Sequence, residues 1–382
     1  MAEVTTTPRP RALRRRWAAL LWLVIVVVLG WYALLVWKGE TTPRRLPRQL
    51  MPRAHSGDRV LVIAPHADDE AIGAGVYMRQ AVEAGAAVYV CLLTNGEGEE
   101  LGAVWTNRSL RLTPGHFRRL GLVRQQETRR ALARAGVPAD HVFFLGYPNR
   151  GLDQMLAAVH WDREDPWRSP FLKTTISPYA NSRTIGTPFA GAALRDDLQQ
   201  VLEAIRPTVV LTCHPRDVHR DHWPAYAFTR LALDTLAAQD RGMWARHLPV
   251  YTYLVHYGGW PVPFGYAPAA PLTPPAALEE LPANRWLELP VDVSHRADKR
   301  AMLAEYHSQV GAYAPLIQSF IRTNELFATV PETRPAEDEA VLAAGEAEPN
   351  AESKALRRQP GADFAEVHCR LDSRRVALRF IL

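Results

Sequence analysis

The segment Pro65-His66-Ala67-Asp68-Asp69-Glu70 places an imidazole and three carboxylates directly after a short apolar run. His66 and Asp69 are three residues apart at an expected strand-to-helix turn, so both side chains can face one point. A neutral imidazole and a carboxylate are a ligand pair that zinc accepts. Asp68 is then left beside the metal. The alternative is that Asp68 or Asp69 only caps the helix, because helix N-termini attract carboxylates.

A second polar cluster, residues 214–222, follows another apolar run and contains three histidines and two aspartates. If the two apolar runs are strands of one parallel sheet, both clusters lie at the edge where the carboxyl ends of the strands meet. His222 could therefore complete a His, Asp, His set that leaves coordination positions for water and substrate. We expect a catalytic metal site at this edge, since five such groups within nine positions are hard to assign to chance.

Short apolar runs alternate with helical patterns through the middle of the chain. The expected strands are 59–64, 87–94, 141–146, 208–213 and 250–256, and the expected helices are 70–84, 116–135, 191–205, 222–238 and 294–309. This alternation predicts an α/β fold, a Rossmann-like three-layer sandwich with a mostly parallel sheet. Residues 153–188 and 258–282 show no clear period and are expected to be long loops over the edge that carries the site.

Residues Trp17–Trp37 form 21 consecutive positions without a charge. A helix rises about 1.5 Å per residue, so this run spans one hydrocarbon core and predicts a single transmembrane helix. A cleaved signal peptide would have an apolar region about half as long. Five arginines between Arg9 and Arg16 favour a cytoplasmic N-terminus and an extracytoplasmic catalytic domain. The reverse orientation is the alternative, because the basic segment 44–53 would bind anionic headgroups equally well from the cytoplasmic face.

The composition of the chain is that of an ordinary globular protein, with 382 residues, 47% of them hydrophobic and 22% charged. The net charge is +5, and the arginines cluster in residues 9–16, 44–53 and 108–134. The first two clusters flank the apolar run, which fits a membrane surface better than a nucleic acid. Cys91, Cys213 and Cys369 lie far apart and are expected to be free thiols. The expected organisation is a basic tail (1–16), a transmembrane helix (17–37), a linker (38–57), a catalytic domain (58–330), and an Ala/Pro-rich linker with a short extension that ends in a hairpin (331–382).

The two polar clusters resemble the signature motifs of the LmbE-like, or PIG-L, family of zinc-dependent N-deacetylases. Pro-His-x-Asp-Asp-Glu matches at 65–70 and His-x-Asp-His matches at 219–222. The likeness covers about residues 58–325 and also includes Leu93-Thr94-Asn95-Gly96-Glu97, Arg124-x-x-Glu127, Phe144-Leu145-Gly146-Tyr147-Pro148, Arg206-Pro207-Thr208-Val209-Val210 and Ser308-Gln309. Three positions depart from the pattern: Ala67 and Arg220 stand where the family often has proline, and Tyr306 where many members have histidine.

The resemblance implies a role for each residue that matches the motifs. The implied zinc ligands are His66, Asp69 and His222. Asp68 would be the general base, and a protonated His219 would face the acyl oxygen. Asp221 would orient a histidine from outside the ligand set.

The resemblance also implies a class of substrate, an N-acetylglucosamine conjugate, and the predicted anchor suggests a lipid-linked or cell-envelope glycan. Asn95 and Arg124 are candidate substrate-binding residues. Arg124 could equally form a structural salt bridge with Glu127, because the two are at helical spacing.

Other functions of the same residues need to be weighed. Gly73-x-Gly75 could indicate a dinucleotide site, but these glycines lie inside an expected helix and follow three acidic residues that would repel a pyrophosphate. A two-magnesium phosphohydrolase could use Asp68, Asp69 and Asp221, although the histidines favour zinc. An amidase that acts on another amide, such as a thiol conjugate, and a non-catalytic glycan-binding protein of the same fold are further alternatives.

Overall fold

The computed structural model describes residues 21–28, 30–31, 48–279, 285–330, 340–344, 366–371 and 376–381. The chain divides into two compact units, Met1–Thr329 and Val330–Leu382.

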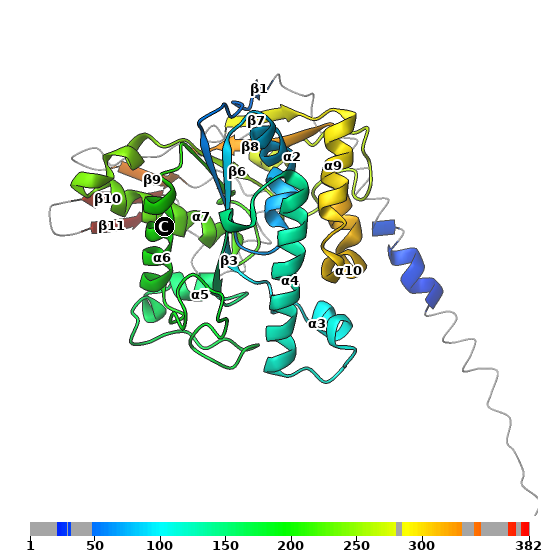
Figure 1. Cartoon of the computed structure of the whole chain (residues 1–382), viewed down its shortest axis with the longest axis horizontal. Coiled ribbons are helices and arrows are strands. Elements are labelled where there is room, and N and C mark those ends of the chain that lie inside the picture. Colours follow the sequence, from blue (N-terminus) through cyan, green and yellow to red (C-terminus); the bar gives the residue numbers. More distant parts are fainter. Residues whose placement is uncertain are drawn as a thin grey trace, which may run out of the picture. The chain divides into compact units, whose positions relative to one another are not determined.

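The larger unit is built on an eight-stranded sheet with the strand order β1-β7-β8-β6-β5-β2-β3-β4 (Figure 1). The strands are β1 (Gln49–Leu50), β2 (Arg59–Ala64), β3 (Ala87–Thr94), β4 (Val142–Tyr147), β5 (Val209–Cys213), β6 (Val250–Tyr253), β7 (Arg285–Pro290) and β8 (Asn324–Thr329). Strands β6, β5, β2, β3 and β4 pair in parallel, whereas β8 is antiparallel to both β6 and β7. The prediction of a mostly parallel sheet is therefore confirmed, and one side of the sheet is mixed.

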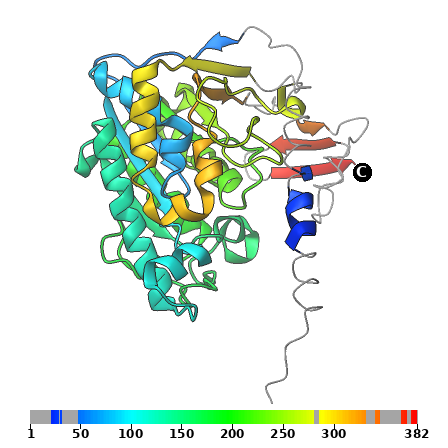
Figure 2. The same cartoon turned by 90° about the vertical axis from the view of Figure 1, so that its right-hand side faces the viewer.

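Helices cover both faces of this sheet (Figures 1 and 2). One face carries α2 (Asp69–Glu83), α4 (Pro114–Ala135), α9 (Val293–Leu303) and α10 (His307–Gln318), and the other carries α5 (Leu152–Leu156), α6 (Gly191–Ile205) and α7 (His222–Ala237). Successive side chains of β2 alternate between the two cores: Val60 and Val62 pack with α2, and Leu61 and Ile63 pack with α6 and α7. Strands that are buried on both faces must be apolar throughout, which is why their sequence pattern was readable.

The prediction of one helix over residues 294–309 is wrong, because the chain forms α9 and α10 with a break between them. Tyr306 lies in this break with non-helical backbone angles (φ −83, ψ 61). Its side chain is fully buried and its hydroxyl donates a hydrogen bond to the Glu70 carboxylate. A tertiary contact therefore interrupts a pattern that is locally helical.

Strand β8 was not predicted, because it begins with polar residues that the fold buries. Asn324 and Glu325 are each 1% exposed. The Glu325 carboxylate accepts hydrogen bonds from the backbone N–H groups of Val76 and Tyr77, both at 2.9 Å, and pairs with Lys299 at 2.7 Å. These partners lie on α2 and α9, far from β8 in the sequence. The sequence around β8 therefore gives no sign that its polar side chains can be buried.

The two ends of the chain are described only in part. Residues 21–28 and 30–31 are helical, and the remainder of the predicted transmembrane helix lies outside the described residues. Within the part of the chain that the structure describes, no helix has both the length and the apolar character needed to cross a membrane. The smaller unit is an antiparallel sheet of β9 (Ala340–Ala344), β10 (Glu366–Leu371) and β11 (Val376–Ile381) in the order β11-β10-β9. The predicted terminal hairpin is β10 and β11, whereas β9, inside the expected linker, was not predicted.

The cysteine prediction is confirmed for two residues. Cys91 and Cys213 are free and buried, and burial raises the pKa of each thiol to about 12. Cys369 lies on β10, and its side chain lies outside the described residues.

Candidate metal centre

Two neighbouring parallel strands bring the two polar clusters together. Strand β2 pairs with β5, β2 leads through His66 into α2, and β5 leads through residues 214–221 into α7. The clusters therefore meet at the carboxyl edge of the sheet, where ligands of such folds bind. His66, Asp69 and His222 are all buried there.

Three candidate ligand atoms converge at this edge. His66 Nδ1 lies 3.0 Å from Asp69 Oδ2, and His222 Nε2 lies 3.2 Å from the same oxygen and 3.2 Å from His66 Nδ1. Ligand atoms bound tetrahedrally to one metal ion at about 2.0–2.2 Å are separated by about this distance. Two imidazole nitrogens and one carboxylate oxygen therefore form a donor set that fits a metal ion with three protein ligands and positions left for water or substrate.

Asp221 holds His66 in the orientation that this donor set requires. Its carboxylate lies 2.9 Å from His66 Nε2 and also accepts hydrogen bonds from the backbone N–H groups of Arg150 (2.6 Å) and Leu152 (3.0 Å). A proton held on Nε2 by Asp221 leaves the lone pair of Nδ1 facing Asp69 and His222. The predicted orienting role of Asp221 thus has a specific partner, His66.

Asp217 does the same for His222, and the sequence reasoning assigned it no role. Its Oδ2 lies 3.1 Å from His222 Nδ1 and accepts the backbone N–H groups of Val255 (3.0 Å) and His256 (2.9 Å). Although burial opposes it, the neighbouring His222 lowers the pKa of Asp217 to about 2. The spacing of residues within the cluster could not predict this pairing, because Asp217 is held by backbone N–H groups that follow β6.

The structure places His219 beside the ligand set in a neutral form. Its ring lies 4.7 Å from that of His66, and its Nδ1 accepts the backbone N–H of Asp221 at 3.2 Å. Burial and the neighbouring imidazoles lower the pKa of His219 to about 2. This direction is opposite to the expectation of a protonated His219, and the N–H that Nδ1 accepts leaves Nε2 as the ring nitrogen that can donate.

His256 extends this group of histidines and was not predicted. It follows β6, and its ring lies 4.7 Å from that of His222 and 5.1 Å from that of His219. Among the residues that the structure describes, those that could hold a metal ion form two overlapping groups, His66 with His219 and His222, and Asp69 with His222 and His256. The ligand atoms of His66, Asp69 and His222 lie within 3.0–3.2 Å of one another, which makes these three the candidate ligand set. The position of His256 at the carboxyl end of an expected strand was the one signal that could have drawn attention to it.

Asp68 lies beside the ligands in a strained backbone conformation. Its φ of 111° is in a region that residues other than glycine rarely adopt, and such strain is typical of functional sites. Burial raises the pKa of Asp68 to about 7, and the Arg124 guanidinium opposes this rise. No hydrogen bond from its side chain caps α2, so the capping role considered for Asp68 is not the one that the structure shows.

Arg124 is a structural link between the loops that carry the site. Its guanidinium donates hydrogen bonds to the carbonyl groups of Ala67 and Gly96 and lies 3.6 Å from Asp68 Oδ1. A Cβ atom at position 96 would overlap this guanidinium, so the glycine is required there. The salt bridge considered between Arg124 and Glu127 is not formed, because the Glu127 carboxylate accepts two hydrogen bonds from Ser308 instead.

Asn95 has an internal position similar to that of Arg124. Its side chain is 1% exposed, and its Oδ1 accepts a hydrogen bond from Gln125 at 3.0 Å. In this conformation the side chain supports the loop after β3. The expectation that it contacts a substrate gains no support from this position.

Glu70 connects Tyr306, which stands where many family members have histidine, to the candidate metal centre. One Glu70 oxygen accepts the Tyr306 hydroxyl, and the other accepts the backbone N–H of Asp68 at 3.1 Å. Burial raises the pKa of Glu70 to about 8. Tyr306 therefore supports, through Glu70, the strained backbone at Asp68.

The other two departures from the family pattern also have visible partners. Arg220 forms a two-pronged ion pair with Asp153, with N to O distances of 2.8–3.2 Å, which ties the loop after β5 to α5. Ala67 is buried, and its carbonyl accepts Arg124.

Two of the alternative functions lose their basis in this geometry. Gly73 lies in α2 against the Tyr253 ring, where any Cβ would overlap the ring, so helix packing explains this glycine without a dinucleotide. The Asp221 carboxylate is occupied by His66 and two backbone N–H groups, so it does not join Asp68 and Asp69 in a magnesium site. What remains is the type of site that metal-dependent hydrolases have, three candidate ligands with a further carboxylate, that of Asp68, beside them.

Comparisons with known proteins agree with this class. Residues 61–233 match the family described as PIG-L: GlcNAc-PI de-N-acetylase. This matched segment, which contains both polar clusters, belongs to the PIG-L/LmbE family of deacetylases. The 1D-myo-inositol 2-acetamido-2-deoxy-alpha-D-glucopyranoside deacetylase of Corynebacterium efficiens is 28% identical over 201 residues, which are 52% of this chain and 56% of the relative. The chain thus spans about half the length of the curated relative that it matches.

Solved structures of two deacetylases align with much of this chain at low identity. The A40926 pseudoaglycone deacetylase is 19% identical, with a TM-score of 0.45 over 73% of this chain and 99% of that protein. The N,N'-diacetylchitobiose deacetylase from Pyrococcus horikoshii is 17% identical, with a TM-score of 0.39 over 72% of this chain and 84% of that protein.

Proposed function

We propose that this protein is a zinc-dependent hydrolase that removes the N-acetyl group from an N-acetylglucosamine-type glycoconjugate. The observation that carries the proposal is the convergence of His66 Nδ1, Asp69 Oδ2 and His222 Nε2 within 3.0–3.2 Å of one another, with the Asp68 carboxylate beside them. Two nitrogen ligands and one oxygen ligand favour zinc over magnesium, which prefers oxygen ligands.

Each residue of the site has a separate task in amide hydrolysis. Zinc held by His66, Asp69 and His222 would supply a water with a pKa lowered to about 7 and would polarise the acyl oxygen. Asp68 accepts the proton of the attacking water and passes it to the departing nitrogen. His219 donates its Nε2 proton to the acyl oxygen as negative charge develops there, and loss of such a donor costs about 3 kcal/mol of barrier.

The nature of the substrate rests on similarity and on the predicted anchor. The curated relative acts on a 2-acetamido-2-deoxy-glucopyranoside linked to myo-inositol, which supports an N-acetylated amino sugar as substrate here. The apolar run at Trp17–Trp37 supports a lipid-linked or cell-envelope glycan. We further propose a cytoplasmic N-terminus and an extracytoplasmic catalytic domain, because translocating the arginines before the anchor costs more than translocating a long domain.

The proposal is tested by incubating the zinc-loaded full chain in detergent with a panel of N-acetylglucosamine conjugates and measuring acetate release. Thiol-conjugate amides and phosphate monoesters serve as comparison substrates. We expect acetate from at least one amino-sugar conjugate, and no acetate from that conjugate with the Asp68→Asn variant. Cleavage of the thiol conjugates alone would assign the alternative amidase activity. No turnover of any substrate by zinc-loaded protein would favour a glycan-binding protein of this fold.

A further inference from the structure

Helix α3 (Glu100–Asn107) turns an apolar stripe toward solvent. Leu101, Val104 and Trp105 occupy positions i, i+3 and i+4 and share one side of the helix. Leu101 is 59% exposed and Trp105 is 79% exposed, whereas Gly102 and Ala103 are the buried residues of α3. A surface helix ordinarily packs its apolar side against the core. Helix α3 instead exposes large apolar side chains to solvent.

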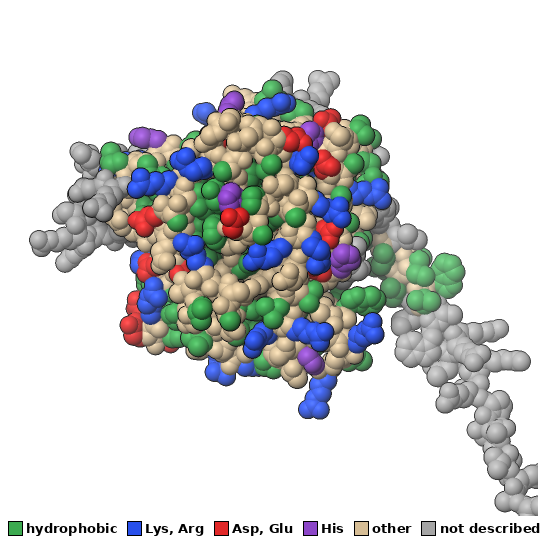
Figure 3. All heavy atoms as spheres, in the orientation of Figure 1, with side chains coloured by type: hydrophobic (Ala, Val, Ile, Leu, Met, Phe, Trp, Pro, Cys, Tyr) green, Lys and Arg blue, Asp and Glu red, His purple; other side chains and the backbone are tan. Residues whose placement is uncertain are grey.

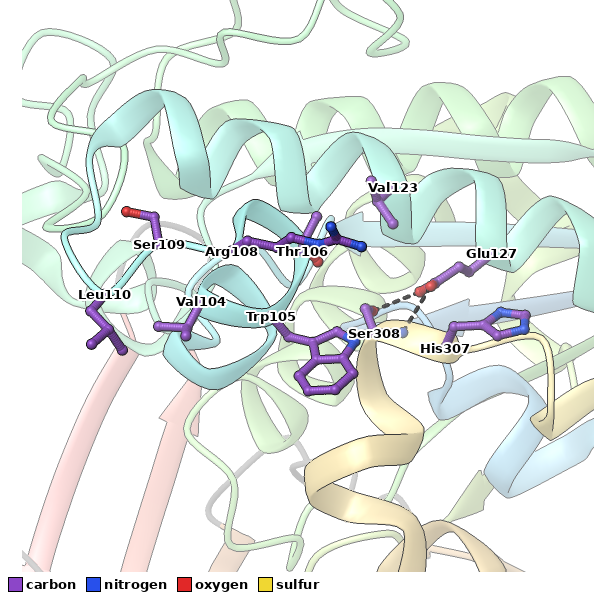
Figure 4. Close-up of a pocket in the computed structure, with 10 residues that line it drawn as sticks. All are labelled: Val104, Trp105, Thr106, Arg108, Ser109, Leu110, Val123, Glu127, His307 and Ser308. Atoms are coloured by element: carbon purple, nitrogen blue, oxygen red, sulfur yellow. Dashed lines mark hydrogen bonds between the residues drawn. The ribbon is translucent and has the colours of Figure 1, made fainter.

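The exposed apolar surface continues beyond α3. Leu110 is 91% exposed, the highest fraction among the large hydrophobic side chains that the structure describes, and Trp105 is second. Val104, Trp105 and Leu110 also line a cavity of about 600 Å³ between α3, α4 and the start of α10, with the Glu127 and Ser308 hydrogen bonds at its inner end (Figure 4). These side chains form one patch at the rim of a hollow, and such patches mark interaction sites.

The patch lies in a strongly basic segment. Residues 101–119 contain four arginines, Arg108, Arg111, Arg118 and Arg119, and no aspartate or glutamate. All four are exposed. In Figure 3, basic and hydrophobic side chains lie next to each other at the end of the molecule formed by α3 and the start of α4.

The acidic side chains nearest to this segment have partners of their own. Glu99 caps α3 and also accepts the Tyr313 hydroxyl at 3.2 Å. Glu100 lies 3.5 Å from the Arg150 guanidinium. Within the part of the chain that the structure describes, neither carboxylate forms an ion pair with any of the four arginines.

We propose that residues 101–119 form a membrane-docking surface for a bilayer that contains anionic lipids. Trp105 and Leu110 insert at the level of the headgroups, where tryptophan is enriched, and the four arginines contact lipid phosphates. Three exposed apolar side chains provide less contact area than the roughly 800 Å² per partner of a stable protein interface. A shallow insertion into lipid needs only a few such residues.

The surface lies close in the chain to the carboxyl edge of the sheet. Helix α3 follows the loop after β3, and Glu100 at its start pairs with Arg150, whose backbone N–H donates to Asp221. Docking through α3 would therefore bring the edge with the candidate metal centre near the headgroups.

A nitroxide spin label at position 109 tests this inference in the full chain. The Ser109→Cys variant, with Cys369→Ser to remove a competing thiol, is placed in nanodiscs of phosphatidylcholine alone or with phosphatidylglycerol. Cys91 and Cys213 are buried and do not compete for the label. Power-saturation electron paramagnetic resonance then measures collisions with oxygen, which concentrates in lipid, and with a water-soluble nickel chelate.

We expect the label at position 109 to gain collisions with oxygen and lose collisions with nickel in the anionic nanodiscs. A matched label at Val293, which is 73% exposed at the start of α9, should not change. Trp105→Ser with Leu110→Ser, and separately Arg108→Gln with Arg111→Gln, should abolish the gain. Equal nickel collisions at position 109 in both nanodiscs would overturn the inference. Immobilisation of the label in detergent without lipid would also overturn it, and would assign the patch to a protein contact.

Discussion

The Asp221 carboxylate lies 2.9 Å from His66 Nε2, and this contact turns the other ring nitrogen of His66 toward Asp69 and His222. The hydrogen bond joins residues that are 155 positions apart in the sequence. It decides the tautomer and the direction of a proposed metal ligand, so it supplies the first prediction.

Replacing Asp221 with asparagine should weaken zinc binding by about 10- to 100-fold, the usual cost of losing the group that orients a ligating histidine. Zinc affinity would be measured by competition with a chromogenic chelator. Asp153→Asn is the matched control, because Asp153 pairs with Arg220 in a more exposed position. Equal zinc affinity of the Asp221 variant and the wild type would contradict the assignment.

Replacing His66 with alanine should remove the bound metal, because two remaining ligands do not form a closed donor set. Elemental analysis of the purified full chain should find about one zinc per wild-type chain and much less in the variant. His160→Ala provides the control, since His160 lies outside the cluster. Equal zinc contents would take His66 out of the ligand set.

Replacing Asp68 with asparagine should leave the metal bound and reduce kcat by about 10²- to 10⁴-fold, the usual loss when a general base is removed. The amide is similar in size but cannot accept the proton. Acetate release and zinc content are measured on the same preparation, with the exposed Asp140→Asn as control. Near-normal turnover of the variant would show that Asp68 is not the general base.

Replacing Tyr306 with phenylalanine should lower the free energy of unfolding by about 1–3 kcal/mol, because the buried Glu70 oxygen loses its donor. We also expect a lower kcat with unchanged zinc content, since Glu70 supports the backbone of Asp68. Chemical denaturation and acetate release measure the two effects. Tyr313→Phe, which removes a hydroxyl from a partly exposed ring, should change the stability by less than about 0.5 kcal/mol. Similar changes in stability and kcat for both variants would show that the Tyr306 hydroxyl has no specific role in supporting Glu70.

The proposed topology predicts that protease added to intact, wall-stripped cells digests the catalytic domain and spares a cytoplasmic control protein. The reason is the charge asymmetry: the arginines before the anchor stay on the cytoplasmic side. Immunoblotting against the domain follows the digestion. Full protection until the membrane is permeabilised would reverse the topology and indicate a lipid-linked substrate on the inner leaflet.

Local spacing was enough to predict much of the fold and the chemical identity of the site. Short, continuous apolar runs predicted β2 and β3 with their observed bounds, since strands buried on both faces are apolar throughout. The spacing of His66 and Asp69 placed both side chains at one turn, and the parallel sheet brought His222 to the same edge. These inferences depend on residues within one strand or turn, or on the general geometry of parallel sheets.

The choice of partners across the chain became visible in the folded structure alone. Asp221 pairs with His66, and Asp217 rather than Asp221 pairs with His222, although all four residues occur in the two polar clusters. Local spacing cannot distinguish these pairings, because they depend on where two loops place their backbone N–H groups. The same holds for Tyr306, whose bond to Glu70 breaks a helical pattern, and for the outward stripe of α3. Each is the result of competition between local preference and burial, and burial is a property of the whole fold.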